Sequence, residues 1–478
     1  MSERSVSRRE LFWYAAGSVP GGIGVLAWNY LVFYYNQVLG ISGLMIGLGA
    51  LFVSLFDAVT DLAVGSASDR TRSRWGRRHP YLFLAAVPSA MTFYLMFWVP
   101  AGLSGSGLLV WLLALHLFKR VVDTCYSVPY LALGAEISRG HEERTRIATW
   151  RAVFFNIGRS TAGALLLLVF LRPTEAYPDG QLNPAGYVDF AAWMSVVIAV
   201  HLLLSAWQTR KWSSQLAASA QGAVGSLREM GADLRGVMRH RPFRSVLFGS
   251  ISRHMAWGMS DALGIFMMTF FWRIDTEVMF LWGVGMFSGM FAGLPFWRWV
   301  AGRIDKRAVA ILGDVTYLFF FCVPYLLRIA GCWPEEGSAA YVPLYVLTTG
   351  LLAHFGIAAS GPMVGSMLGD VTDYDELETG QRREGVIFAA ESFSWKALTG
   401  LGPLLAGLVI DWVGISDASD PAGVPDATVT ALGLAQGGVM FVFFVFAIFF
   451  ISRYDLGRAR HAAVLAALES RAAEGGAR

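Results

Sequence analysis

Two aspartates lie four residues apart in an apolar stretch of this sequence, a spacing that could bind a cation. Asp57 and Asp61 belong to the run FDAVTD, which also holds Thr60. If this run is helical, both carboxylates project from one face of the helix. Two carboxylates and a hydroxyl form an oxygen-only site that suits Na⁺, or a proton held by one carboxylate. The alternative is a structural pair that hydrogen-bonds neighbouring helices and positions the arginine-rich segment that follows.

Other ionisable residues also interrupt apolar runs. Arg120 and Asp123 are three residues apart, so they could form an ion pair on one helix face, and Thr124 adds a hydroxyl. Arg159 stands near the middle of another apolar run and needs an acidic neighbour, for which Asp123 is a candidate, or an anionic substrate. A charge at membrane depth costs roughly 2.5–3.5 kcal/mol on insertion scales, so such residues usually line a polar cavity. The alternative is an ion pair that only makes burial tolerable.

Two later runs carry further charges. Arg253, His254 and Asp261 fall in one of them, where Arg253 and His254 could line the cavity or Arg253 could instead extend its head group to the cytoplasmic membrane surface. Glu391 and Lys396 fall in the other. Lys396 lies well inside its run, which favours a role in coupling over a structural ion pair.

The composition excludes most soluble proteins. Of 478 residues, 55% are hydrophobic and 15% charged, whereas soluble domains contain about 45–50% apolar and about 25% charged residues. The 38 basic and 35 acidic residues nearly cancel, which indicates no nucleic-acid partner, and three cysteines cannot form a disulfide framework. No nucleophile–base pair or metal-ligand cluster stands out. We therefore expect an integral membrane protein, no enzyme, and no cofactor beyond a coupling ion, Na⁺ or H⁺.

The elements that position these residues must be membrane-spanning helices. A helix needs about 20 mostly apolar residues to cross a bilayer. Long runs do not alternate in polarity as barrel strands do. The sequence predicts twelve spans: 11–38, 41–66, 82–101, 107–136, 148–171, 189–208, 243–273, 278–300, 308–330, 341–369, 384–412 and 429–452.

Charges in the connecting segments predict the orientation. Lys and Arg concentrate in cytoplasmic loops, and here they gather in 67–80, 209–244 and 298–307. Both termini are therefore expected in the cytoplasm, with the protein in the bacterial inner membrane. The longest polar stretch divides the spans into two sets of six, as in transporters built from repeats. The predicted divisions are an N-terminal bundle, a middle loop, a C-terminal bundle and a tail: 1–208, 209–242, 243–452 and 453–478.

Three motifs, in positions that agree with this layout, resemble one known family. They are YYNQVLGIS (34–42), FDAVTDLAVGSASDRTRSRWGRRHPYL (56–82) and GDVTDYDELETGQRREGVIFAAESFSWK (369–396). The chain resembles the glycoside–pentoside–hexuronide:cation symporters, the melibiose-permease branch of the major facilitator superfamily. The resemblance implies an all-α major facilitator fold with two six-helix bundles, a monomer, and cation-coupled symport of a small solute by alternating access.

The resemblance also implies roles for individual residues. Lys396 matches a lysine near both cation and substrate, and Arg151 matches an arginine at the cytoplasmic end of span five. The positions that match the family's cation site are Asp57, Thr60, Asp61 and Thr124.

The sequence departs from the sugar carriers where they bind sugar hydroxyls. At the positions of two sugar-binding carboxylates of the family, this chain has Gly21 and Ser127. It has Asp123 and Arg159 in addition. The loss of two acceptors and the gain of an arginine favour an anionic or amphipathic substrate. A Na⁺-dependent carrier of lysophospholipid or another amphiphile is the alternative, which aromatic residues such as Trp395 permit.

Charged residues at the cytoplasmic ends of the helices suggest a gate. Arginines that follow span two, and bases near 303–307, are expected to form salt bridges with an acidic loop before span eleven and to release them during transport. The alternative is that the bases only determine topology. The predicted gate residues are Asp69, Arg70, Arg77, Arg78, Asp370, Asp373, Asp375 and Glu376.

Overall fold

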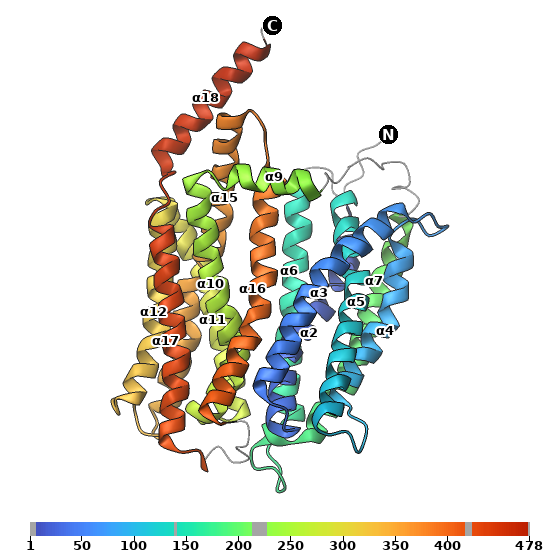
Figure 1. Cartoon of the computed structure of the whole chain (residues 1–478), viewed down its shortest axis with the longest axis vertical. Helices are drawn as coiled ribbons and strands as arrows, with labels where there is room; N and C mark the ends of the chain where they lie inside the picture. Colours follow the sequence, from blue (N-terminus) through green and yellow to red (C-terminus); the bar gives the residue numbers. More distant parts are fainter. Residues whose placement is uncertain (1–5, 138–140, 213–226, 416–422, 477–478) are drawn as a thin grey trace. The chain divides into compact units, whose positions relative to one another are not determined.

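The computed structural model describes residues 6–137, 141–212, 227–415 and 423–476, and all regular elements in these ranges are helices (Figure 1). The side chains of Asp69 and Lys396 lie outside the described part, as do residues 213–226 of the predicted middle loop and the last two residues of the tail. The all-helical fold class is confirmed.

The chain forms two compact units. Unit 1 comprises residues 1–222, 275–280 and 410–421, and unit 2 comprises 223–274, 281–409 and 422–478. The helices of unit 1 are α1 (Arg8–Ala16), α2 (Val19–Phe33) with the π-turn η1 (Tyr34–Val38), α3 (Gly43–Arg70), α4 (His79–Phe97), α5 (Gly105–Ile137), α6 (His141–Leu165) with η2 (Leu166–Phe170), and α7 (Pro184–Thr209).

Glycines bring α2 and α6 into backbone contact. A Cβ at Gly22 would lie 2.0 Å from the carbonyl oxygen of Phe155, and one at Gly158 would lie 2.4 Å from that of Val19. Small residues at such a crossing let transmembrane helices pack closely. The crossing fixes α6, which carries Arg151 and Arg159, against α2.

The start of α3 is held by two side chains of unit 1. The Ser42 hydroxyl accepts the N–H of Met45 (3.4 Å), and the Asp411 carboxylate accepts the N–H groups of Gly43 (2.9 Å) and Leu44 (3.0 Å). These bonds satisfy N–H groups that have no partner within the helix. They anchor the helix that carries Asp57 and Asp61.

Unit 2 has corresponding long helices and a terminal helix. Its elements are α9 (Leu227–Val237), α10 (Arg241–Phe266) with η5 (Met267–Phe271), most of α11 (Thr276–Ala301), α12 (Lys306–Ile329), α13 (Tyr341–Tyr345), η6 (Val346–Leu352), α14 (Ala353–Ile357), α15 (Ser360–Thr379), most of α16 (Glu384–Val413), α17 (Asp426–Ile451) and α18 (Arg458–Gly476). Val464 of α18 is buried in a core with Tyr454 and Leu456, so this helix is packed onto the unit.

Eleven helices of the described residues are long and apolar enough to cross a membrane. They correspond to eleven of the twelve predicted spans. The remaining span, predicted over 243–273, is the helix α10 continued by η5. It has the required length, but charges that include Arg253 and Asp261 lower its hydropathy.

One local prediction is wrong. The acidic stretch Asp370–Glu378 was expected in a loop, yet α15 continues through it to Thr379 and ends at Gly380, whose φ is +73°. Nothing before Gly380 interrupts the helix, and glycine adopts this left-handed conformation without steric cost. The acids therefore project from the last turns of a rigid helix.

Candidate cation site and charged networks

Thr124 joins the two aspartates predicted to bind a cation. Its hydroxyl on α5 lies 3.2 Å from Oδ1 of Asp57 and 3.2 Å from Oδ1 of Asp61, both on α3. A hydroxyl has one hydrogen, so it donates to one carboxylate at a time and offers its lone pairs to a cation. On α3, Leu55 and Val59 are 62% and 66% exposed, as lipid-facing side chains are. The structure therefore brings Asp57, Asp61 and Thr124 together, and their role as cation ligands stays a prediction.

The fourth predicted ligand, Thr60, is oriented along its own helix. Its hydroxyl donates to the carbonyl oxygen of Asp57 at 3.0 Å. Its lone pairs remain as acceptors.

Arg120 belongs to this cluster, which corrects a prediction. Its Nη1 lies 3.7 Å from Oδ2 of Asp57. The expected pairing of Arg120 with Asp123 is wrong, because Asp123 pairs with Lys119 instead. Nζ of Lys119 lies 3.0 Å from Oδ1 and 2.9 Å from Oδ2 of Asp123. The Ser89 hydroxyl also donates to Asp123 (2.6 Å). Lys119 and Asp123 are four residues apart, a signal that sequence reasoning overlooked.

The predicted substrate residues of unit 1 lie on α5 and α6. The guanidinium of Arg151 lies 5.4 Å from the ring centre of Tyr130, a cation–π contact, and its buried Nε has no hydrogen-bond partner in the described part. Arg159 lies two turns further along α6 and is half-buried. Ser127, three residues beyond Thr124 on α5, is exposed.

In unit 2, the predicted substrate residue Trp395 packs beside a polar cluster. Its ring contacts His254 edge-on at 4.9 Å and Trp257 at 6.0 Å. The alternative in which Arg253 reaches the membrane surface is wrong: it is 6% exposed and its Nη2 lies 3.3 Å from Oδ2 of Asp314. A buried acid on α12 gives this guanidinium a partner inside the unit.

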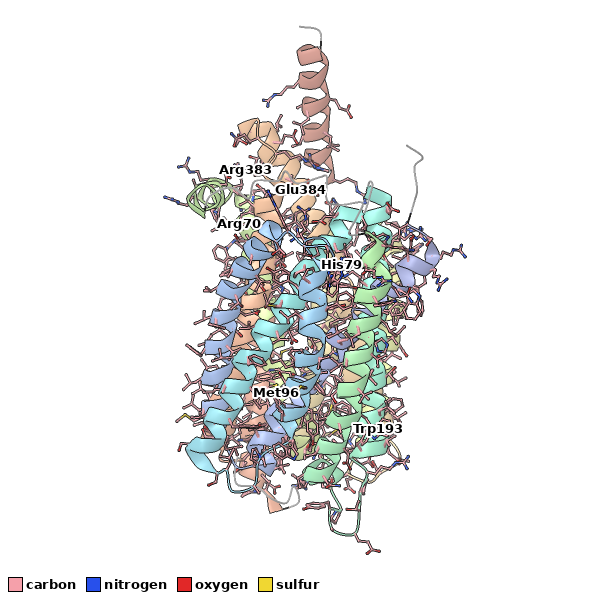
Figure 2. The ribbon with its side chains drawn as sticks, turned by 90° about the vertical axis from the view of Figure 1, so that its right-hand side faces the viewer. Arg70, His79, Met96, Trp193, Arg383 and Glu384 are labelled. Carbon is pink, nitrogen blue, oxygen red and sulfur yellow. The ribbon has the colours of Figure 1, made fainter. Side chains whose placement is uncertain are left out.

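The predicted gate arginines of unit 1 share one acid that sequence reasoning missed. Arg77 and Arg78 donate to Oε1 of Glu136, at the end of α5, with Nη2 distances of 2.7 and 2.8 Å. Arg78 also donates to Ser68 (2.6 Å). Arg70 is exposed at the end of α3. His79 begins α4 at the same end of unit 1, and Met96 lies near the opposite end of α4 (Figure 2).

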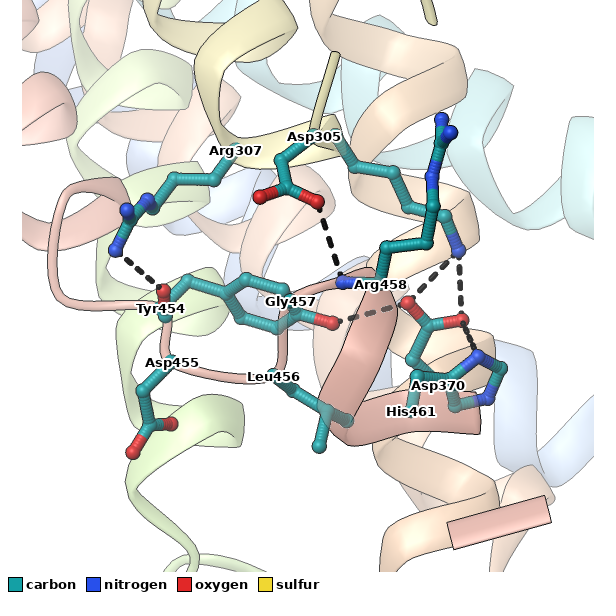
Figure 3. Close-up of a pocket in the computed structure, with 10 residues that line it drawn as sticks. Asp305, Arg307, Asp370, Tyr454, Asp455, Leu456, Gly457, Arg458 and His461 are labelled. Atoms are coloured by element: carbon teal, nitrogen blue, oxygen red, sulfur yellow. Dashed lines mark hydrogen bonds and ion pairs between the residues drawn. The ribbon is translucent and has the colours of Figure 1, made fainter. Parts of the chain in front are cut away.

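The gate acids of unit 2 begin with Asp370, which accepts hydrogen bonds from two side chains and lies beside His461 (Figure 3). Nζ of Lys306 lies 2.7 Å from both of its oxygens, the Tyr454 hydroxyl donates at 3.1 Å, and Nδ1 of His461 lies 3.5 Å away. Burial and the nearby carboxylate raise the pKa of Tyr454, which keeps it a donor. Lys306 is the first residue of α12, Asp370 lies on α15, and Tyr454 precedes α18. Asp370 therefore connects α12, α15 and the C-terminal tail.

The remaining gate acids of α15 have basic partners in the same unit. Asp375 is fully buried between His240, at 2.8 Å, and Arg383. Arg382 reaches Glu376 at 2.8 Å and Asp373 at 3.2 Å. The Glu376 and Asp375 carboxylates raise the pKa of the Arg382 and Arg383 guanidinium groups, respectively.

Sequence comparisons place the chain among transporters. A family described as "MFS/sugar transport protein" matches residues 13–458. The inner membrane symporter YicJ of Escherichia coli is 26% identical over 82% of this chain and 80% of its own length. The isoprimeverose transporter of Lactiplantibacillus pentosus is 24% identical over 80% of this chain and 75% of its own length. The sodium-dependent lysophosphatidylcholine symporter 1-A of Danio rerio is 23% identical over 76% of this chain and 70% of its own length.

The fold agrees with solved transporter structures. The crystal structure of the nucleoside transporter NupG superposes with a TM-score of 0.57 at 12% identity, covering 94% of this chain and 98% of that one. At this identity the likeness concerns the fold alone. The matching family spans nearly the whole chain, so the protein belongs to the MFS/sugar transport protein family of the major facilitator superfamily.

Proposed function

We propose that this protein is a cation-coupled symporter that carries a small glycoside or uronide across the inner membrane by alternating access. The observation that carries the proposal is the meeting of Asp57, Asp61 and Thr124 on neighbouring membrane helices. The similarity to a protein named as a symporter and to one named as an isoprimeverose transporter supports the solute class.

The oxygen atoms around Asp57 suit a monovalent cation such as Na⁺, or a proton. The Arg120 guanidinium, 3.7 Å from Asp57, already supplies one positive charge to the cluster, which disfavours a divalent ion. One charge moving through the membrane potential supplies about 2.3 kcal/mol per 100 mV. That is enough for tens-fold accumulation of solute, since about 1.4 kcal/mol corresponds to a factor of ten.

The substrate is proposed to contact basic residues. The proposed contacts of unit 1 are Arg151 and Arg159 on α6, which supply positive charge, with Ser127 and Asp123 on α5. Those of unit 2 are Trp395 and Lys396, on α16. Arginine binds carboxylates through two parallel hydrogen bonds, which favours an acidic sugar over a neutral one.

A second candidate is transport of a lysophospholipid or a similar anionic amphiphile. It is favoured by the similarity to the lysophosphatidylcholine symporter, which is named as sodium-dependent. The same arginines would bind the phosphate, and the aromatic pair Trp257 and Trp395 would contact the chain.

The charged networks at the helix ends are proposed to form the cytoplasmic gate. Glu136 neutralises Arg77 and Arg78, and Lys306 neutralises Asp370, each within its own unit. Exchange of these partners during transport would let the bundles, predicted over 1–208 and 243–452, move as rigid bodies. The protein acts as a monomer with both termini in the cytoplasm.

A thermal-shift screen of the purified protein tests the proposal. Glycosides, uronates and lysolipids are each added with and without Na⁺, and at two pH values to include proton coupling. Stabilisation that needs both solute and cation supports symport and identifies the solute, because ligands that bind the folded state raise its melting temperature. Stabilisation by the solute that no cation changes contradicts coupling.

A further inference from the structure

Four ionisable side chains meet in the interior of unit 2, and none of them belongs to the cation site of unit 1. Arg253 and His254 are adjacent on α10, Asp314 lies on α12, and Glu391 lies on α16. Asp314 is fully buried, and Arg253 and His254 are 6% and 9% exposed. Ionisable groups inside membrane helices are costly and usually have a function.

Arg253 and Asp314 form an ion pair within this cluster. Nη2 of Arg253 lies 3.3 Å from Oδ2 of Asp314, and the Ser360 hydroxyl donates to Oδ1 of Asp314 at 2.6 Å. The positive charge of Arg253 is therefore matched by Asp314. Glu391 has to be neutralised in another way.

Among the described side chains, His254 lies within ion-pair distance of Glu391, but the two are not hydrogen-bonded. Its Nε2 lies 3.6 Å from Oε1 of Glu391, beyond hydrogen-bond range. The Ser394 hydroxyl lies 3.4 Å from the other ring nitrogen, Nδ1. Oε2 of Glu391 and the hydroxyl of Ser250 are buried without a hydrogen-bond partner in the described part of the chain.

The charges of the cluster balance only after one proton is taken up. With His254 neutral, one arginine and two carboxylates leave one negative charge, which is expensive to bury. Of the elements packed around it, α15 contributes Ser360 at its start and carries its acids only from Asp370 onward, and α17 has no ionisable residue after Asp426. Asp261 lies two turns further along α10, and the Lys396 side chain lies outside the described part.

We propose that Glu391 and His254 form a proton-binding site, in which a proton from water binds Oε2 of Glu391. A protonated Oε2 becomes a donor, and the neighbouring Ser250 hydroxyl, itself buried without a partner in the described part, can accept its hydrogen. The binding of one proton also removes the net charge of the cluster. The site shares no residue with the Asp57 and Asp61 cluster, so the protein binds a proton in unit 2 whether unit 1 holds Na⁺, a proton or no cation.

Infrared difference spectroscopy of the purified full-length protein tests this proposal without any transported solute. Spectra are recorded from mildly acidic to mildly alkaline pH with Na⁺ saturating. We expect a carboxylic-acid C=O band that fades as the pH rises, and we expect Glu391→Gln to remove it. The matched control is Glu336→Gln, an exposed glutamate of unit 2 that is 46% accessible, which keeps the band. A wild-type protein without the band, or a Glu391→Gln variant that retains it, overturns the proposal.

A second variant tests the charge balance and does not depend on whether the Glu391→Gln protein folds. Asp314→Asn removes one negative charge, so Arg253 then favours the ionised form of Glu391. The midpoint of the band should move to lower pH by about 1 to 3 units. An unchanged midpoint overturns the proposal. The infrared experiment measures protonation and not transport. A negative infrared result would therefore not contradict symport, and a negative transport assay would not contradict the proton-binding site.

Discussion

Arg120 places its guanidinium 3.7 Å from the Asp57 carboxylate, so an arginine occupies part of the cluster proposed to bind the coupling cation. Like charges repel, and the side chain of Arg120 is 43% exposed, which leaves it free to move away. We infer that the incoming cation competes with Arg120 for Asp57. This competition makes the site reversible, as a transport cycle requires.

The first prediction concerns this competition. Arg120→Gln should raise the affinity for Na⁺ about fivefold, since a half-exposed charge at this distance contributes about 1 kcal/mol after solvent screening. Na⁺-dependent thermal stabilisation measures the affinity. Lys119→Gln is the control, because Lys119 pairs with Asp123, and it should leave the Na⁺ affinity unchanged. Weaker Na⁺ binding in Arg120→Gln would mean that the arginine supports the site.

The second prediction concerns the hydroxyl between the two aspartates. Thr124→Val keeps the shape of the side chain and removes the hydroxyl, so cation binding should weaken about tenfold, the worth of one buried hydrogen bond or ligand. Thr124→Ser restores the hydroxyl and should bind nearly as wild type does. The same Na⁺ titration distinguishes the variants. Equal affinities for all three proteins would exclude Thr124 as a ligand.

The third prediction concerns the network at the end of unit 1. Glu136→Gln leaves Arg77 and the buried Arg78 without their carboxylate, which should cost about 2–3 kcal/mol and lower the melting temperature in detergent. Glu384→Gln is the control, because this acid is 55% exposed and pairs with an exposed arginine, so its loss should be nearly neutral. Similar melting temperatures for the two variants would show that the Glu136 network contributes no stability.

The fourth prediction concerns Asp370 in unit 2. Tyr454→Phe removes one donor and should cost about 1 kcal/mol of stability, whereas Asp370→Asn leaves Lys306 unpaired and should cost about 3 kcal/mol. The double variant should cost less than the sum, because both changes act on one network. Thermal unfolding of the four proteins gives the coupling. Additive effects would show that Tyr454 acts independently of Asp370.

The sequence alone was sufficient to predict the helices and the central pair of aspartates. Apolar runs of membrane length follow directly from hydropathy, and the four-residue spacing of Asp57 and Asp61 places them on one helix face. Thr124 adds a hydroxyl next to Asp123 and matches a position of the family's cation site, and the structure places it between the two aspartates. Local patterns sufficed for these residues because the helix geometry is regular.

Partners from distant parts of the chain could not be predicted in this way. Glu136 lies 58 residues from Arg78, and Tyr454 lies 84 residues from Asp370, so no spacing rule connects them. The burial of Arg253 depends on Asp314, which lies on a different helix. These pairings arise from helix packing, which a single sequence does not encode in any local pattern.

The central claim is that a cation bound between Asp57, Asp61 and Thr124 drives the accumulation of a solute. Its most direct test is uptake of a labelled solute, identified by the thermal-shift screen, into proteoliposomes with an imposed Na⁺ or proton gradient. The account predicts accumulation above equilibrium for the wild type, its loss when an ionophore collapses the gradient, and its loss in Asp61→Asn. Accumulation that survives the ionophore, or that is as large in Asp61→Asn as in the wild type, would contradict it.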